Sequence, residues 1–338
     1  MASITKAQIV ALSKIFKKGT KELDELLSYK AEDVLLDFGK EKTEEFRNLV
    51  LQIEKEIRDS GLSLITYWDC EYPEALRGID APPVFLFVKG NLEYLSYDLF
   101  AVVGTRKMSS YGKQVTEQFT KELSKHFVIV SGMASGVDSA AHLTALRNKR
   151  PTIAVLGCGI NYIYPKSNKS LYEEILKNGC IVSEYLPWEI PKKYTFIARN
   201  RIISGLSQGV LVTEASIDSG ALITAKFALE QGRDVFAVPG DIHRSLSEGT
   251  NYLIQNGAYL VKNPSDLLEY YGFKEHQKLI SLSDEEKEFL NVLDTEKSIE
   301  DIAEILKKSI SEVLVNVTVL ELKGLVYKTE RGTYSRTI

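Results

Sequence analysis

Short apolar runs alternate with stretches of helical periodicity between residues 84 and 238, and this alternation restricts the possible folds most strongly. The runs have the length of β-strands and lie at residues 84–88, 99–103, 127–130, 152–156, 180–183, 209–213 and 234–238. Helices are expected between most of them, at residues 111–125, 137–148, 168–178 and 221–231. Strands that are apolar throughout are buried on both faces. The pattern therefore predicts an α/β fold with a parallel sheet that helices cover on both sides.

Helical patterns flank this region at both ends of the chain. Residues 1–65 have apolar positions spaced for short helices, with breaks at Gly19 and Phe38-Gly39. Residues 280–338 have the order of a winged helix, three helices followed by a two-stranded hairpin. We therefore expect three domains, which cover residues 1–65, 66–275 and 280–338.

Several classes of protein are excluded by simple features of the sequence. The cysteines, Cys70, Cys158 and Cys180, are odd in number and far apart, so neither a disulfide framework nor a zinc site is indicated. The four histidines are scattered, and His142 has no second ligand at metal spacing. The N-terminus lacks a signal-peptide pattern, and no apolar run reaches 18 residues. We expect a cytoplasmic protein with no metal and no catalytic residues.

Turns rich in small residues follow three of the predicted strands. The first contains Gly104 and Arg106, the second contains Ser131 and Gly132, and the third contains Gly157. Each leads toward a predicted helix whose first N–H groups can bind an anion, and Arg106 adds a fixed positive charge. The G-x-G-x-x-G and G-x-x-x-x-G-K-[ST] patterns of nucleotide sites are missing. The turns therefore predict an anion site without a nucleotide cofactor.

The segment PKKYTFIARNR at residues 191–201 interleaves four basic residues with two aromatic ones. This composition is typical of single-strand binding, in which cations follow the phosphates and an aromatic ring stacks on a base, with about 1 to 3 kcal/mol per base. The alternative is that Tyr194 and Phe196 belong to the core and the cations to a solvated face.

Many motifs between residues 66 and 262 resemble the DNA-processing protein A (DprA, also called Smf) family. They include VVGTRKMSSYG, IVSGMASGVDSAAH, the segment around IPKKYTFIARNR, and EGTNYLIQNGA. The resemblance implies an extended Rossmann-like domain without a cofactor, an N-terminal helical domain of sterile-alpha-motif or helix-hairpin-helix type, and a C-terminal winged-helix (DML1-like) domain. It also implies a homodimer that is not an enzyme. Such a protein binds and protects incoming single-stranded DNA during natural transformation and loads RecA recombinase onto it.

The same resemblance assigns residues to a single-stranded DNA pocket. Arg106 and Lys166 correspond to phosphate contacts. A lysine and a phenylalanine of the family pocket correspond to Lys193 and Phe196, of which Phe196 is the base-stacking candidate. The remaining members of the pocket are Gly104, Ser131, Gly132, Gly157, Lys169, Arg199, Asn200 and Arg201. One of the two arginines could instead brace the fold through acidic partners.

Two positions depart from the family pattern, and one segment is assigned to the dimer. Ser135 stands where the family often has a cation, and Ile197 stands where it often has proline. The dimer contacts are expected at Asn251, Ile254 and Leu260. The alternative for the apolar residues Ile254 and Leu260 is ordinary helix and strand core.

Charge is distributed unevenly along the chain. The formal net charge of -4 by itself argues against a nucleic-acid partner. Residues 99–208, however, hold 15 basic and 7 acidic residues, and they contain most of the motifs assigned to the pocket. The third helix of the predicted winged helix instead carries Glu312 and Glu321 and no cation before Lys323, which favours protein contact over duplex binding.

The sequence leaves two alternative functions open. One is a nucleotide-processing hydrolase of the lysine-decarboxylase-like type, although its P-G-G-x-G-T-x-x-E signature is not matched by Val238-Pro239-Gly240-Asp241. The other is an interaction scaffold, which the basic residues at positions 106, 166 and 193 make less favourable.

Overall fold

A computed structural model of the chain describes residues 4–26, 39–273, 283–329 and 332–336. The chain divides into two compact units, Met1–Phe273 and Lys274–Ile338. The predicted break at Phe38 and the predicted domain boundary between 275 and 280 lie outside the described residues.

One mixed sheet organises the first unit. Among the described residues it has nine strands in the order β1-β2-β6-β5-β4-β3-β7-β8-β9. All seven predicted runs form strands in it. The strands are β1 (Ser63–Thr66), β2 (Phe85–Gly90), β3 (Leu99–Val103), β4 (Val128–Ser131), β5 (Thr152–Val155), β6 (Cys180–Ser183), β7 (Gly209–Val212), β8 (Asp234–Ala237) and β9 (Tyr259–Leu260).

Strands β3 to β9 are parallel to one another, and β2 alone among the described strands of this sheet runs in the opposite direction. Strand β2 pairs antiparallel with both β1 and β6, whereas its apolar run led us to expect a parallel strand. Residues 85–88 are buried, and a strand that ran in the opposite direction would need the same buried side chains. An apolar run reports burial on both faces and does not report strand direction.

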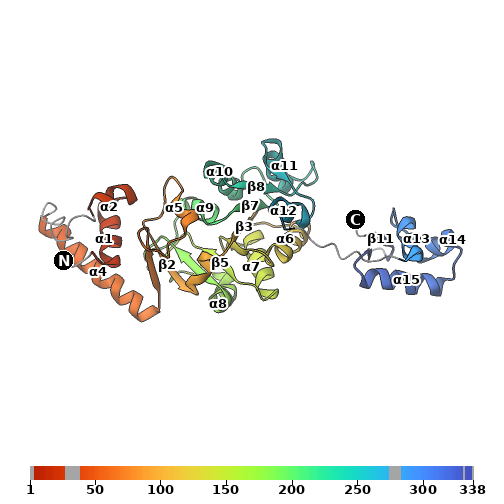
Figure 1. The fold of residues 1–338 in the computed structure, drawn as a ribbon, viewed down its shortest axis with the longest axis horizontal. Helices are drawn as coiled ribbons and strands as arrows, with labels where there is room; N and C mark the ends of the chain where they lie inside the picture. The colour runs from red at the N-terminus through yellow and green to blue at the C-terminus, as the bar shows by residue number, and fades with distance from the viewer. Residues whose placement is uncertain (1–3, 27–38, 274–282, 330–331, 337–338) are drawn as a thin grey trace. The chain divides into compact units, whose positions relative to one another are not determined.

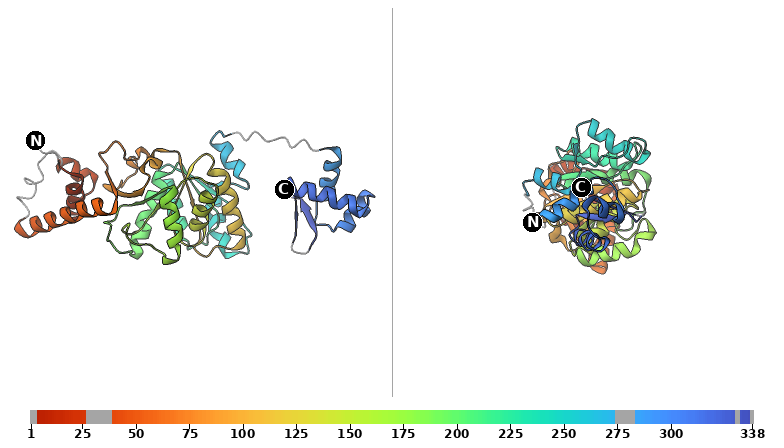
Figure 2. Two further views of the ribbon diagram at one scale, coloured as in Figure 1. Left: turned by 90° about the horizontal axis from the view of Figure 1, so that it is seen from below. Right: turned by 90° about the vertical axis from the view of Figure 1, so that its right-hand side faces the viewer.

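Helices cover both faces of the sheet (Figures 1 and 2). One face packs on α5 (Glu74–Arg77), α9 (Lys193–Leu206), α10 (Gly220–Glu230) and α11 (Ser245–Gln255). The other face packs on α6 (Ser110–Leu123), α7 (Val137–Arg147), α8 (Lys169–Asn178) and α12 (Pro264–Tyr270). Alternate strand residues point to opposite faces, so each apolar strand supplies both cores.

The N-terminal helices share a core with the sheet. They are α1 (Lys6–Phe16), α2 (Thr20–Leu26) and α4 (Gly39–Ser60). Leu12 of α1 and Ile53 of α4 lie in one apolar cluster with Phe85 and Phe87 of β2. Helices α1 and α4 therefore pack against the sheet within the compact unit Met1–Phe273.

The second unit has the element order predicted for a winged helix. It contains α13 (Asp284–Val292), α14 (Ile299–Leu306), α15 (Ile310–Leu322) and an antiparallel hairpin of β10 (Val326–Lys328) and β11 (Tyr334–Arg336). Phe289, Ile302 and Leu320 are buried at its centre. Across both units, the described helices include none with the length and apolarity needed to span a membrane.

Candidate nucleic-acid interface

A cavity of about 710 Å³ lies at the carboxyl ends of β3 and β7. The strand order reverses between these two strands, because β4, β5 and β6 lie on one side of β3 while β7, β8 and β9 lie on the other. Such a reversal is where parallel α/β sheets bind their ligands. The turn after β3 and the first turns of α9 and α10 line the cavity.

The cavity wall is rich in positive charge. Its basic residues are Arg106, Lys107, Lys192, Lys193 and Arg199, and its acidic residues are Asp138 and Asp218. Arg106 and the three lysines are exposed. A concave surface with an excess of one sign of charge concentrates ligands of the opposite sign, so this cavity is suited to a polyanion.

Arg106, Tyr164 and Phe196 form a cation–aromatic group in this cavity. The guanidinium carbon of Arg106 lies 5.8 Å from the centre of the Phe196 ring. The Tyr164 ring lies 5.0 Å from that ring, with the two planes inclined by 38°. All three residues also line a small adjoining cavity of about 80 Å³. Rings beside a cation are the arrangement on which a splayed nucleic-acid base can stack.

Gly157 provides the space in which Phe196 lies. A Cβ at position 157 would come within 2.7 Å of Cδ1 of Phe196 and 3.0 Å of its Cα. The Thr195 hydroxyl donates to the Gly157 carbonyl, which ties the first turn of α9 to the end of β5. Gly157 therefore contributes to the cavity by allowing close approach of the backbone.

Arg199 is buried and braces two strand ends. Its Nη1 donates to the Gly132 carbonyl at 2.8 Å and also to the Val155 carbonyl. A Cβ at Gly132 would lie 2.6 Å from Nη2 of Arg199. Burial raises the pKa of the neighbouring Asp138, and the charge of Arg199 opposes this rise. Arg199 therefore lines the cavity, but its Nη1 donates to main-chain carbonyls at the strand ends.

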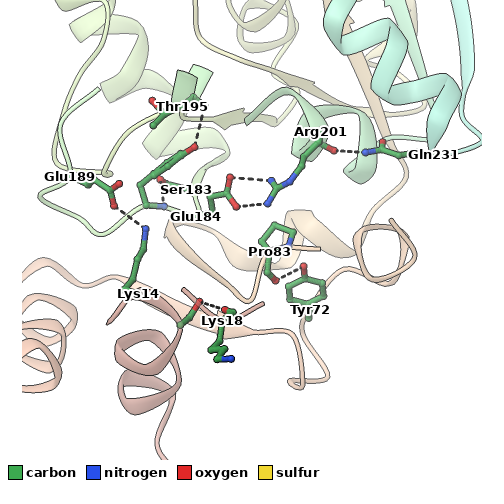
Figure 3. A network of polar contacts seen from close by, with 12 residues as sticks. Lys14, Lys18, Tyr72, Pro83, Ser183, Glu184, Glu189, Thr195, Arg201 and Gln231 are labelled. Carbon is green, nitrogen blue, oxygen red and sulfur yellow. Dashed lines mark hydrogen bonds and ion pairs between the residues drawn. The ribbon is translucent and has the colours of Figure 1, made fainter. Parts of the chain in front are cut away.

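Asn200 connects α9 to α10, and Arg201 faces away from the cavity. Asn200 Nδ2 donates to the Gly220 carbonyl at 3.3 Å. Arg201 forms two bonds to the Glu184 carboxylate, of 3.0 and 2.6 Å (Figure 3). It lines a different cavity, of about 550 Å³, against the N-terminal helices. The structure does not bring Arg201 together with Arg106.

Three other predicted site residues, Lys166, Lys169 and Ser131, are not among the residues that line the cavity. Lys166 and Lys169 are exposed and do not line the cavity. They flank Asn168, whose amide donates to the Met133 carbonyl at 2.9 Å and so fixes this segment beside the turn after β4. Ser131 is buried and donates to the Val102 carbonyl at 2.7 Å, so its hydroxyl is directed into the sheet.

The residues predicted for the dimer lie near the edge strand β9. Asn251 makes two hydrogen bonds with the main chain of Gly240, and Ile254 packs against the core. Leu260 is 47% exposed, as is its neighbour Tyr259. Only Leu260 among the three predicted residues therefore presents a large free apolar surface.

Several cavity residues were not assigned from the sequence. These include Tyr164, Lys107, Lys192 and the first turn of α10 from Ser219 to Thr224. Tyr164 stands directly before Pro165-Lys166, so an aromatic residue beside a predicted phosphate contact was the available signal. The small residues of the α10 turn carried no comparable signal.

Two side chains of types that often act in catalysis, Cys158 and His142, are buried. Burial raises the pKa of the Cys158 thiol to about 11 and lowers the pKa of His142 to about 3. Both groups are therefore neutral near pH 7. Within the described residues there is no cluster of His, Cys, Asp or Glu that could hold a metal ion.

The chain is similar to known proteins over much of its length. Residues 63–272 match the family described as DNA recombination-mediator protein A. The DNA processing protein DprA of Streptococcus pneumoniae is 49% identical over 205 residues, which are 61% of this chain and 72% of that protein. Protein Smf of Escherichia coli is 40% identical over 278 residues, which are 77% of this chain and 74% of that protein.

Two solved structures are also similar to the chain. The X-ray structure of DprA from Streptococcus pneumoniae has 40% identity and a TM-score of 0.65, and the match covers 79% of this chain and 93% of that one. DNA processing protein A from Helicobacter pylori, whose structure is described in terms of its single-stranded DNA binding mode, has 33% identity and a TM-score of 0.57. That match covers 62% of this chain and 95% of the other.

Proposed function

The chain belongs to the DNA recombination-mediator protein A family, and we propose that its 710 Å³ cavity binds single-stranded DNA during DNA uptake and recombination. The observation that carries this proposal is the position of the Arg106 guanidinium over the Phe196 ring, with Tyr164 alongside. A phosphate pairs with Arg106 and the neighbouring lysines. A base of the same strand stacks on the exposed aromatic surface.

The same geometry favours single strands over duplex. Stacking on Phe196 or Tyr164 requires a base that is free of its partner, and a duplex would have to unstack and unpair to provide one. Phosphate pairing by itself does not discriminate between the two, because both carry the same charged backbone. Arg106 and the lysines therefore contribute affinity, and the aromatic pair contributes the preference for single strands.

The binding experiment uses a labelled oligothymidylate and fluorescence anisotropy. Replacing Arg106 with Ala should weaken binding by about 10- to 100-fold, since a hydrogen bond to a charged group contributes roughly 1.5 to 3 kcal/mol. The slope of log affinity against log salt should also become shallower, by about 0.7 for each phosphate that is no longer paired. Lys121→Ala is the matched control, because Lys121 is an exposed cation in the last turn of the same helix that follows Arg106. Equal affinity of the wild type and Arg106→Ala would contradict the proposal.

We further propose that the protein protects the bound strand, acts as a homodimer and loads RecA recombinase. The edge strand β9 supports the homodimer, because it pairs with β8 alone among the described strands and carries the exposed residues Tyr259 and Leu260. An exposed edge strand is a ready site for pairing with a second chain. RecA loading is tested by adding the protein to RecA on oligothymidylate and measuring the rate of filament formation. No increase in that rate would contradict it.

The C-terminal unit is proposed to contact protein rather than duplex DNA. On α15 the side chains of Leu314, Val315 and Leu322 are exposed by 50%, 63% and 85%. The helix carries Glu312 and Glu321 but no cation, so its surface would repel phosphate. The variant Val315→Ser/Leu322→Ser should keep its affinity for duplex DNA and reduce RecA loading. A loss of duplex affinity would instead assign this face to DNA.

The similarity to DprA proteins does not favour the alternative function, a nucleotide-processing hydrolase. Pro239-Gly240 begins two residues after the end of β8, and the next acidic residue is Asp241 rather than the glutamate of the hydrolase signature. Release of free base from a nucleoside monophosphate by the purified chain would restore that alternative.

A further inference from the structure

Glu214 is a buried carboxylate that follows β7 by two residues. Its side chain is 2% exposed, and no Lys, Arg or His nitrogen lies within 4 Å of its carboxylate among the residues that the structure describes. Oε2 accepts a hydrogen bond of 2.8 Å from the main-chain N–H of Ser109, and Oε1 accepts one from the Ser109 hydroxyl. Ser109 is the N-cap of α6. The N-terminus of a helix thus balances this negative charge, in place of a cation.

A glycine in the first turn of α6 makes the close approach of Glu214 possible. A Cβ at Gly112 would lie 2.2 Å from Oε2 of Glu214 and 2.7 Å from its Cδ. Any larger residue at position 112 would therefore displace the carboxylate. The N–H of Gly112 donates to the Ser109 hydroxyl at 3.1 Å, so the N-cap and the carboxylate form one connected group.

Glu214 also holds the other end of the turn that carries Arg106. Its main-chain carbonyl accepts a bond of 2.7 Å from the N–H of Thr105. Thr105 and Ser109 are therefore both bonded to a single residue, and Arg106 lies between them. The N–H of Val137 donates to the Thr105 carbonyl at 3.2 Å, which supports the turn from the side of α7.

The carboxylate lies where nucleotide-binding sheets hold a phosphate. In those folds the phosphate binds at the N-terminus of the helix that follows the strand at the reversal of strand order. Strand β3 is that strand here, since it pairs with β4 on one side and β7 on the other, and α6 is the helix that follows it. The position is therefore filled from within the protein by a negatively charged side chain.

We propose that Glu214 replaces a bound phosphate at the N-terminus of α6, and that it has two effects. It excludes nucleotide phosphates from this end of the sheet, and it positions Arg106 toward the aromatic pair, so that a DNA phosphate binds there instead. The second effect rests on the function proposed above. The first does not, because it concerns only the anion site that Glu214 fills.

The first experiment measures anion binding without DNA. Both Glu214→Ala and Glu214→Gln are made in an Arg106→Ala background, which removes the nearby guanidinium as a competing anion site. Thermal unfolding is then followed in inorganic phosphate and in chloride of equal ionic strength. Glu214→Ala should bind phosphate about tenfold more tightly than its parent, a difference equal to about 1.4 kcal/mol. Glu214→Gln should not, because its amide still fills the site.

The quantity that decides this experiment is the difference in stability between phosphate and chloride, not the stability in either buffer by itself. A Glu214→Ala chain that folds in phosphate but not in chloride supports the proposal. One that is unfolded in both buffers, or that binds phosphate no better than its parent, shows that Glu214 is not a substitute for phosphate.

The second experiment is a double-mutant cycle on oligothymidylate binding. Glu214→Ala should weaken binding about tenfold in the chain with Arg106 and have little effect in the chain with Arg106→Ala, because Glu214 would act only through the turn that carries Arg106, and groups linked in this way show coupled energies. Glu214→Gln should retain affinity to within about threefold, since its amide oxygen can still accept from Ser109. An equal loss from Glu214→Ala in both backgrounds would show general damage to the fold and overturn the positioning role. If Arg106→Ala itself has no effect, the proposed function fails, while the phosphate experiment still tests Glu214.

Discussion

The guanidinium of Arg106 lies over the ring of Phe196, 5.8 Å from its centre, although the two residues come from different strand–helix connections. Arg106 belongs to the turn after β3, and Phe196 lies in the first turns of α9. A single ligand that carries both a negative charge and a flat ring can contact both residues at once. Each of the following experiments tests one consequence of that arrangement or of the fold that supports it.

Phe196 and Tyr194 lie two residues apart on α9 and should differ in their effect on binding. Phe196 lines the cavity, whereas Tyr194 does not and is 62% exposed. Phe196→Ala should weaken oligothymidylate binding by about 5- to 100-fold, since stacking on one base contributes roughly 1 to 3 kcal/mol. Tyr194→Ala should leave it nearly unchanged. The measurement is fluorescence anisotropy at several salt concentrations, and an equal loss in both variants would place the stacking surface elsewhere.

Arg199 should affect stability rather than phosphate binding. Arg199→Lys removes the Nη1 donor that the Gly132 and Val155 carbonyls share, so the free energy of unfolding should fall by roughly 3 kcal/mol, because each buried carbonyl left unpaired costs about 1 to 3 kcal/mol. The salt dependence of DNA binding should stay as in the wild type. Urea unfolding and salt titrations measure the two quantities. A stable Arg199→Lys chain with a reduced salt slope would show that Arg199 contacts phosphate directly.

His142 should make the protein less stable in mild acid. Its Nδ1 lies 2.7 Å from the Thr152 hydroxyl, and burial lowers its pKa from 6.5 to about 3. Between these two values the unfolded chain binds a proton that the folded chain does not, so stability falls as the pH is lowered, by up to about 1.4 kcal/mol per pH unit. Urea unfolding at pH values from neutral to mildly acidic measures this slope. His142→Gln should flatten it and the exposed control His243→Gln should not, whereas equal slopes in all three chains would assign the acid sensitivity to other groups.

Leu260 is the residue with which the proposed dimer can be tested. Leu260→Asp should convert the protein to a monomer, because it places a charge on the exposed edge strand. The matched control is Leu51→Asp, since Leu51 is an exposed leucine on α4, 63% accessible and distant in sequence. Size-exclusion chromatography with light scattering measures the mass. A wild type that is already monomeric, or a Leu260→Asp chain that remains dimeric, would contradict this assignment.

Local patterns were sufficient to predict most of the sheet. All seven apolar runs form strands, and the helices α6, α7, α8 and α10 begin within a few residues of their predicted starts. Strand β1 was missed because only two of its four residues, Leu64 and Ile65, are apolar, and β9 because it has only two residues. The antiparallel direction of β2 was missed because both directions require the same buried side chains.

The candidate site was predictable in composition but not in detail. The sequence placed the positive excess in residues 99–208, and its resemblance to the family assigned Arg106 and Phe196 to the pocket. It did not distinguish the two arginines of α9, because residues two apart on a helix point in directions about 200° apart and either direction could face the cavity. The structure directs Arg199 into the fold and Arg201 toward Glu184.

The sequence by itself determined which segments become strands, which turns contain small residues, and where the basic residues are concentrated. These properties depend on residue type and spacing along a continuous stretch of chain. Only the tertiary structure decided that Arg106, Tyr164 and Phe196 meet in one cavity and that the Glu214 carboxylate fills the N-terminus of α6. Those contacts join segments that are up to about 100 residues apart, so they depend on strand order and helix rotation, which no local pattern records.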